Sequence, residues 1–162
     1  MKIPKSWAAL ALGRAFAYVA AMAGEGQPGS HAPDAKCMEV MARATIAALP
    51  PTFAAHLGDI RLIVEDFASD AILREMGIED PFDLTGLYTG RPIGESAQTG
   101  DMPSTIHLFR RPLLDEWVET GVSLEALISH VVIHEIGHHF GLSDADMHAL
   151  EDAVGDAEGD TA

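Results

Sequence analysis

The residues best suited to chemistry lie together in the segment 134–144, which reads His-Glu-Ile-Gly-His-His-Phe-Gly-Leu-Ser-Asp. On a helix, residues i and i+4 share one face, one turn apart. His134 and His138 can therefore direct two imidazoles at one ion. Glu135 lies about 100° further round the helix and can lean over the open side of that ion. Two imidazole ligands beside a carboxylate base are what a zinc hydrolase needs.

A third protein ligand is predicted at Asp144. Gly141 stands one turn after His138, where a glycine can take a left-handed conformation and turn the chain back toward the ion. The spacing from His138 favours Asp144; Asp146 is the alternative, and His148 a more remote one. Three protein ligands leave one position open for water, as in catalytic rather than structural zinc sites. We therefore expect one Zn²⁺ ion with Glu135 as the catalytic base.

The helix that carries this motif is expected to be buried, because residues 127–133 before it are mostly apolar. Polar side chains in such a helix need partners. His130 lies on the edge of the ligand face and is interpreted as a surrounding residue rather than a ligand. His139 lies about 140° from His134 and is predicted to point away from the metal.

Composition limits the classes of partner. The chain has 162 residues, which indicates one main domain, and a formal net charge of −15. Such a charge is repelled by phosphate backbones, so nucleic acid is not an expected partner. Cys37 is the single cysteine, which excludes an intramolecular disulfide and a four-cysteine zinc site. The expected partner is a peptide or protein substrate, and the oligomeric state is left open.

The two ends of the chain differ from its middle. Residues 1–34 are interpreted as an N-terminal extension and linker, 35–155 as the catalytic domain and 156–162 as an acidic tail. Lys2 and Lys5 precede an apolar run from Trp7 to Ala23, as in a signal peptide, but Arg14 interrupts it. That charge disfavours membrane insertion and favours a cytoplasmic protein. A mature chain that starts at Gly24 would instead indicate a secreted or periplasmic protein.

Helix and strand patterns are mixed along the chain. Helical spacing and capping signals predict a helix over 35–49, ended by two prolines, the motif helix from Ser123 to about Phe140, and a final helix over 145–154. A short turn is expected over 53–57, a short helical or irregular segment over 69–76, and a helical segment over 113–120. Strands are predicted at 60–64 and 105–109, with 84–88 either a strand or a turn, and 91–103 as a loop. This order favours an α+β fold in which a small twisted mixed sheet carries the motif helix on one face. Val132, Ile133, Ile136 and Phe140 are expected to face that core.

The sequence also resembles the minimal zincin-like metallopeptidases of bacteria, which share the His-Glu-x-x-His-x-x-Gly-x-x-Asp motif. The similarity extends to residues 49–53, to the strand that ends at Asp66, and to the stretches 84–90 and 106–113, in the family's order. It covers about residues 35–150. The resemblance implies a compact zincin-like fold, with His134, His138 and Asp144 as metal ligands and Glu135 as the catalytic acid/base.

The resulting hypothesis is a zinc-dependent metallopeptidase in which Glu135 activates a metal-bound water. Its substrate is expected to pair with an exposed edge strand such as Thr105 to Phe109. Tyr88 and His107 are candidate donors to the oxyanion, although each is more often a packing or surface residue. The alternative is a zinc-binding adaptor or regulatory domain without turnover. A metal-dependent endoribonuclease is disfavoured by Glu135 and by the net charge.

Overall fold

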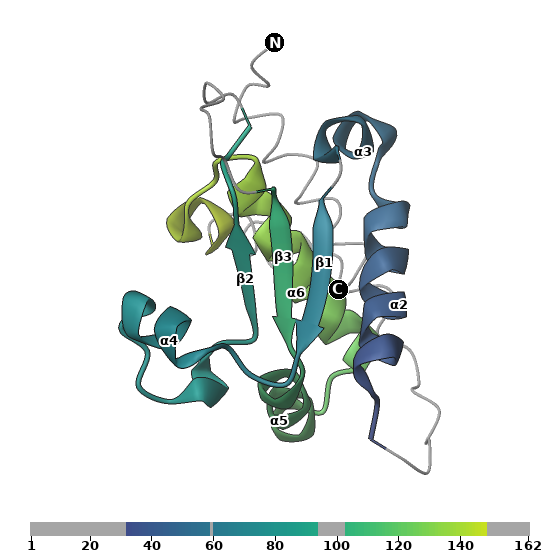
Figure 1. Cartoon of the computed structure of the whole chain (residues 1–162). Coiled ribbons are helices and arrows are strands. Elements are labelled where there is room, and N and C mark those ends of the chain that lie inside the picture. Colours follow the sequence, from purple (N-terminus) through teal and green to yellow (C-terminus); the bar gives the residue numbers. More distant parts are fainter. Residues whose placement is uncertain (1–31, 59, 94–102, 149–162) are drawn as a thin grey trace, which may run out of the picture.

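The fold is built on a small sheet of three strands (Figure 1). The structure is a computed structural model, and it describes residues 32–58, 60–93 and 103–148. The strands are β1 (Arg61–Glu65), β2 (Gly86–Thr89) and β3 (Thr105–Phe109), in the order β1-β3-β2. β3 pairs with β1 in parallel and with β2 in the antiparallel sense. The mixed sheet confirms the predicted α+β class.

Two long helices pack on one face of this sheet, where α6 (Leu124–His139) passes behind the strands and α2 (Ala35–Ala48) lies beside β1 (Figure 1). Ser123 caps α6, its side chain accepting a hydrogen bond from the Ala126 N–H at 3.2 Å, as predicted. Nearly every side of α6 is buried, which explains its continuous apolar sequence. The expected core residues Val132, Ile133, Ile136 and Phe140 are all buried, which confirms the orientation of the helix.

The remaining described elements connect these parts. Three of them lie close to segments expected from the sequence: α3 (Pro51–Leu57), α4 (Asp70–Met76) and α5 (Arg110–Thr120). The 3-10 helix η1 (Pro81–Asp83) was not expected. Residues 144–148 are also helical and form the described part of the expected final helix. Residues 1–31 of the N-terminal extension, most of the predicted loop over 91–103, the rest of the expected final helix and the acidic tail lie outside the described residues.

The start of α5 was predicted three residues too late. The sequence placed the helix at Leu113 and treated Arg110, Arg111 and Pro112 as the close of the preceding strand, but α5 begins directly after β3 at Arg110. Pro112 is the third residue of that helix, where a missing N–H is tolerated because the first-turn N–H groups have no partner within the helix. A proline near a strand end was therefore misread as a breaker.

The expected role of β3 as an exposed edge strand is wrong. β3 is the central strand of the described sheet, because both of its sides are occupied, by β1 and by β2. A strand with two partners has no free backbone groups for a third chain. Among the described strands, only β1 and β2 have an outer side, and β2 is the one that packs directly against α6.

No described helix is both long and apolar enough to cross a membrane.

Candidate metal centre

The last two turns of α6 present His134 and His138 on one side of the helix. Their ring centroids are 4.9 Å apart, and the two side chains are 22% and 29% exposed. Imidazoles that are partly covered yet accessible can bind an ion without being displaced from their rotamers. The helix thus places two nitrogen donors side by side, as the i, i+4 spacing predicts.

The chain after α6 turns back toward these imidazoles at Gly141. This residue has a φ of +76°, the left-handed conformation expected of a glycine that ends a helix. Gly141 donates its N–H to the His138 carbonyl at 2.9 Å, and Leu142 donates to the Gly137 carbonyl at 3.0 Å. These bonds occupy carbonyls that the end of the helix would otherwise leave without partners. The reversal brings Asp144 beside the helix it has just left.

Asp144 completes a group of three potential ligands. Its Oδ1 atom lies 3.4 Å from Nε2 of His134 and 3.2 Å from Nε2 of His138. The ligand atoms of the three residues all lie within 4.8 Å of one another. Donor atoms about 2.0–2.1 Å from a tetrahedral zinc ion are separated by roughly 3.3 Å. Both distances to Asp144 are therefore close to those of a tetrahedral site.

A hydrogen bond sets the ring orientation of His138. Its Nδ1 lies 3.0 Å from the Leu142 carbonyl oxygen, which can only accept. Nδ1 must therefore carry the proton, so in the neutral ring Nε2 keeps its lone pair directed at Asp144 and His134. Metal-binding histidines commonly have such an outer partner, which fixes both tautomer and direction.

The alternative ligands are placed elsewhere. Asp146 accepts hydrogen bonds from the Ser143 N–H at 2.9 Å and from the Ser143 hydroxyl at 2.8 Å, and its own N–H donates to that hydroxyl. This reciprocal cap begins the helical turn 144–148. His130 has its ring 6.5 Å from that of His134, and His148 is exposed. Among the described residues, none of these three belongs to the group of converging ligand atoms.

Glu135 belongs to α6, and its side chain lies against β2. Only 7% of the residue's surface is exposed. Burial raises the pKa of its carboxyl to about 7; His138 and the Tyr88 backbone N–H lower it, and Asp144 raises it. A group that exchanges a proton near neutral pH is suited to general acid–base chemistry. The carboxylate predicted to be a catalytic base thus lies in an environment that favours proton exchange.

The raised pKa of Glu135 predicts a pH-dependent stability. The carboxyl binds its proton more tightly in the folded than in the unfolded chain. It therefore leaves the free energy of unfolding unchanged below about pH 4.5 and lowers it as the pH rises through about 7. We expect metal-free Glu135→Gln to be more stable than metal-free wild type by roughly 3 kcal/mol at pH 8, and by under about 1 kcal/mol at pH 5. Urea unfolding at both pH values measures this; equal differences would contradict the burial effect.

Gly86 allows β2 to approach α6 at Glu135. A Cβ atom on this residue would lie 2.5 Å from Cγ1 of Val131 and 3.2 Å from Oε1 of Glu135. Valine is stiff at χ1, so it can yield only if the backbone moves. Gly86 was not among the site residues expected from the sequence. The available signal was a glycine within a possible strand, which often marks a close backbone approach.

We therefore expect Gly86→Ala to destabilise the fold by about 1–3 kcal/mol, as overpacked cores do. Urea unfolding of the single and double variants measures the effect. Val131→Ala removes the side chain that the new methyl group meets, so the double variant should lose less stability than the sum of the two single variants. If the stability losses of the two single variants add up to that of the double variant, the new methyl group does not press on Val131.

The two candidate oxyanion donors are occupied by other contacts. The Tyr88 hydroxyl lies 2.8 Å from Nδ1 of His139, and it also bonds the Arg91 carbonyl and the Ser104 hydroxyl. Burial lowers the pKa of His139, which points away from the ligand group as predicted. His107 is the one partly exposed residue of β3, and it bonds Thr89 and Glu65 on the neighbouring strands. Both therefore act as packing and hydrogen-bonding residues in this structure.

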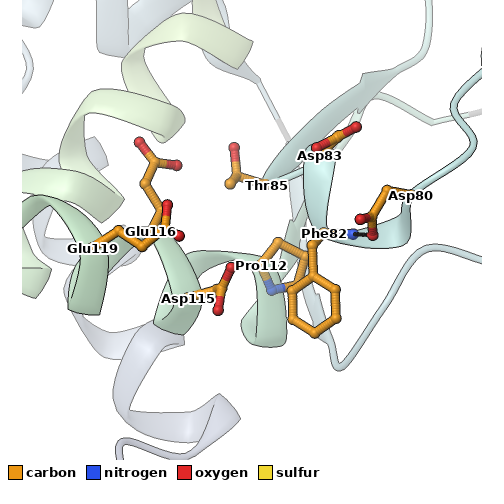
Figure 2. A pocket seen from close by; sticks show the side chains of 8 residues that line it. All are labelled: Asp80, Phe82, Asp83, Thr85, Pro112, Asp115, Glu116 and Glu119. Carbon is orange, nitrogen blue, oxygen red and sulfur yellow. Dashed lines mark hydrogen bonds between the residues drawn. The ribbon is translucent and has the colours of Figure 1, made fainter.

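A separate acidic cavity of ≈ 380 Å³ lies near the start of α5 (Figure 2). Its lining combines carboxylates of α5 with those around η1 (Figure 2). In Figure 1, α5 lies at one end of the sheet and the C-terminal end of α6 lies at the other. The cavity lining includes neither a histidine nor any residue of the ligand group. The lining residues are Asp80, Phe82, Asp83, Thr85, Pro112, Asp115, Glu116 and Glu119.

Comparison with known families agrees with this geometry. The model of one family, described as zincin-like metallopeptidase, matches residues 57–154, which is more than half of the chain. The protein belongs to the zincin-like metallopeptidase family. A search of curated proteins found no match. The family match begins at the end of α3, so α2 lies before it, although that helix packs on α6 and shares the core of the zincin-like fold.

Proposed function

We propose that this protein is a zinc-dependent peptidase in which His134, His138 and Asp144 hold one Zn²⁺ ion and Glu135 is the general base. The observation that carries the proposal is the approach of two imidazole Nε2 atoms to one carboxylate oxygen, at 3.4 and 3.2 Å, next to a buried glutamate. A set of two imidazoles and one carboxylate suits zinc, and three protein ligands leave one position open.

The chemistry divides between the ion and the chain. When bound, zinc lowers the pKa of its water to about 7 and polarises the scissile carbonyl. Glu135 accepts the proton of the attacking water on a carboxylate oxygen and delivers it to the amine nitrogen of the leaving group. Its position against β2 keeps bulk water away from that carboxylate, and in the metal-free protein this burial raises its pKa to about 7. The Leu142 carbonyl holds the His138 ring in place throughout.

We propose that the substrate peptide binds along the outer edge of β2. β2 borders α6 at Glu135, and no described strand pairs with its outer side. An extended peptide that adds to such an edge is held by main-chain hydrogen bonds, with little demand on side chains. N-methylation of single backbone amides near the scissile bond should therefore lower kcat/KM. Unchanged rates for every methylated peptide would rule out this binding mode.

The proposed activity is tested with an unstructured protein or a peptide library as substrate. We expect cleavage that a chelator abolishes and one equivalent of Zn²⁺ restores. A protein that binds one zinc, is stabilised by it and cleaves nothing in the library would instead support an adaptor or regulatory role. Cleavage that persists in the metal-free protein would contradict the mechanism.

A further inference from the structure

Most of the segment that carries Asp144 lies at the surface. Residues 143–146 and 148 are exposed, and the Asp144 side chain is 74% exposed. The cap between Ser143 and Asp146 stiffens the turn internally, but it does not attach the turn to α6. In the described part of this segment after Gly141, only Leu142 and Met147 are buried.

Met147 packs closely against α6 at Gly137. Met147 is fully buried, at 0% exposure. A Cβ atom on Gly137 would overlap the Met147 sulfur and lie 2.9 Å from its Cε. The thioether therefore occupies the space that any other residue at position 137 would fill. A glycine inside a helix lowers stability, and close packing is a usual reason for its presence.

This contact joins the parts that carry the three proposed ligands. Gly137 lies between His134 and His138 on α6, and its carbonyl also accepts the Leu142 N–H. Met147 lies three residues after Asp144 in the same helical turn, so the two side chains leave that turn on one side. A shift of Met147 away from Gly137 must therefore change the distance from Asp144 to both imidazoles.

We propose that Met147 is the positioning residue of the metal site: its fit against Gly137 sets the place of Asp144 and so the metal affinity. The inference rests on the proposed function, because it assumes that the three residues bind an ion. Asp144 itself is exposed, so we expect the buried Met147 of the same turn to keep its carboxylate beside the two imidazoles. Met147 is not a ligand itself, but it thus affects metal affinity through the position of Asp144.

The test measures Zn²⁺ and Co²⁺ affinity of the full chain by competition with a chelator. We expect Met147→Ala to weaken binding by about 10-fold or more, within the range found for residues that orient metal ligands. Met147→Leu keeps the volume and should stay within about 3-fold of wild type. Met38→Ala is the matched control, since Met38 is equally buried but lies on α2. It should lower Tm comparably and leave the affinity within about 3-fold.

The outcomes separate the two proposals. Wild type that binds no zinc overturns the proposed function, and the positioning role with it. Wild type that binds zinc, with Met147→Ala binding equally well, overturns the positioning role alone. Equal losses in Met147→Ala and Met38→Ala would also overturn it, because the effect would then follow stability. If Met147→Ala does not fold, the milder pair Met147→Val and Met38→Val gives the same comparison.

Discussion

Glu135→Gln should abolish most hydrolysis while the protein still binds one zinc ion. The amide matches the carboxylate in shape but cannot accept the proton of the attacking water. General-base catalysis contributes about 10²–10⁴-fold, so kcat/KM is expected to fall by that range. Peptide cleavage assays and elemental analysis of the same sample measure both parts of the prediction.

Stability and a second variant control for indirect effects. Metal-free Glu135→Gln is expected to be more stable than wild type above pH 7, because the wild-type carboxyl is buried and its pKa is raised. Lost activity therefore cannot be assigned to unfolding. Glu125→Gln makes the same chemical change in the first turn of α6, where the side chain is exposed, and should retain activity. A Glu135→Gln protein that cleaves at the wild-type rate would refute the mechanism.

Asp144→Ala should cost more metal affinity than any change outside the ligand set. Its Oδ1 is the atom shared by the contacts to both imidazoles. Removing a residue that only orients a metal ligand typically lowers metal affinity by about 10–100-fold. Removing a ligand itself is expected to lower the affinity by more than about 100-fold. Chelator competition with Zn²⁺ measures the change. Because the side chain is largely exposed, the fold of the metal-free protein should be nearly unaffected.

Asp146→Ala provides the comparison for that experiment. It removes the acceptor that caps the turn at Ser143, and such caps are worth about 1 kcal/mol. Its affinity for zinc should fall less than that of Asp144→Ala. The reverse order, with Asp146→Ala losing the metal and Asp144→Ala keeping it, would move the third ligand to Asp146.

Features determined by local sequence were well predicted. The motif helix was predicted with its Ser123 cap and its end near Phe140, because caps and apolar periodicity are local signals. The convergence of His134 and His138 follows from helical spacing alone. The approach of Asp144 depended on one glycine whose left-handed φ could be expected from its place after the helix.

Features that depend on distant parts of the chain were not predicted. The strand order, with β3 in the centre, follows from the pairing of β3 with two strands elsewhere in the chain, and no pattern within residues 105–109 reports it. The packing of Gly86 on Val131 and of Gly137 on Met147 likewise requires knowing which elements meet. A glycine inside a helix signals that something packs there, but it does not name the partner.

One divalent ion is expected to be held by His134, His138 and Asp144. Anomalous diffraction at the zinc edge from crystals of the zinc-loaded protein would locate that ion. We expect one anomalous peak beside the C-terminal end of α6, about 2.0–2.2 Å from Nε2 of each histidine and from an Asp144 oxygen. A peak bonded to other residues, or none beside these side chains, would contradict the account.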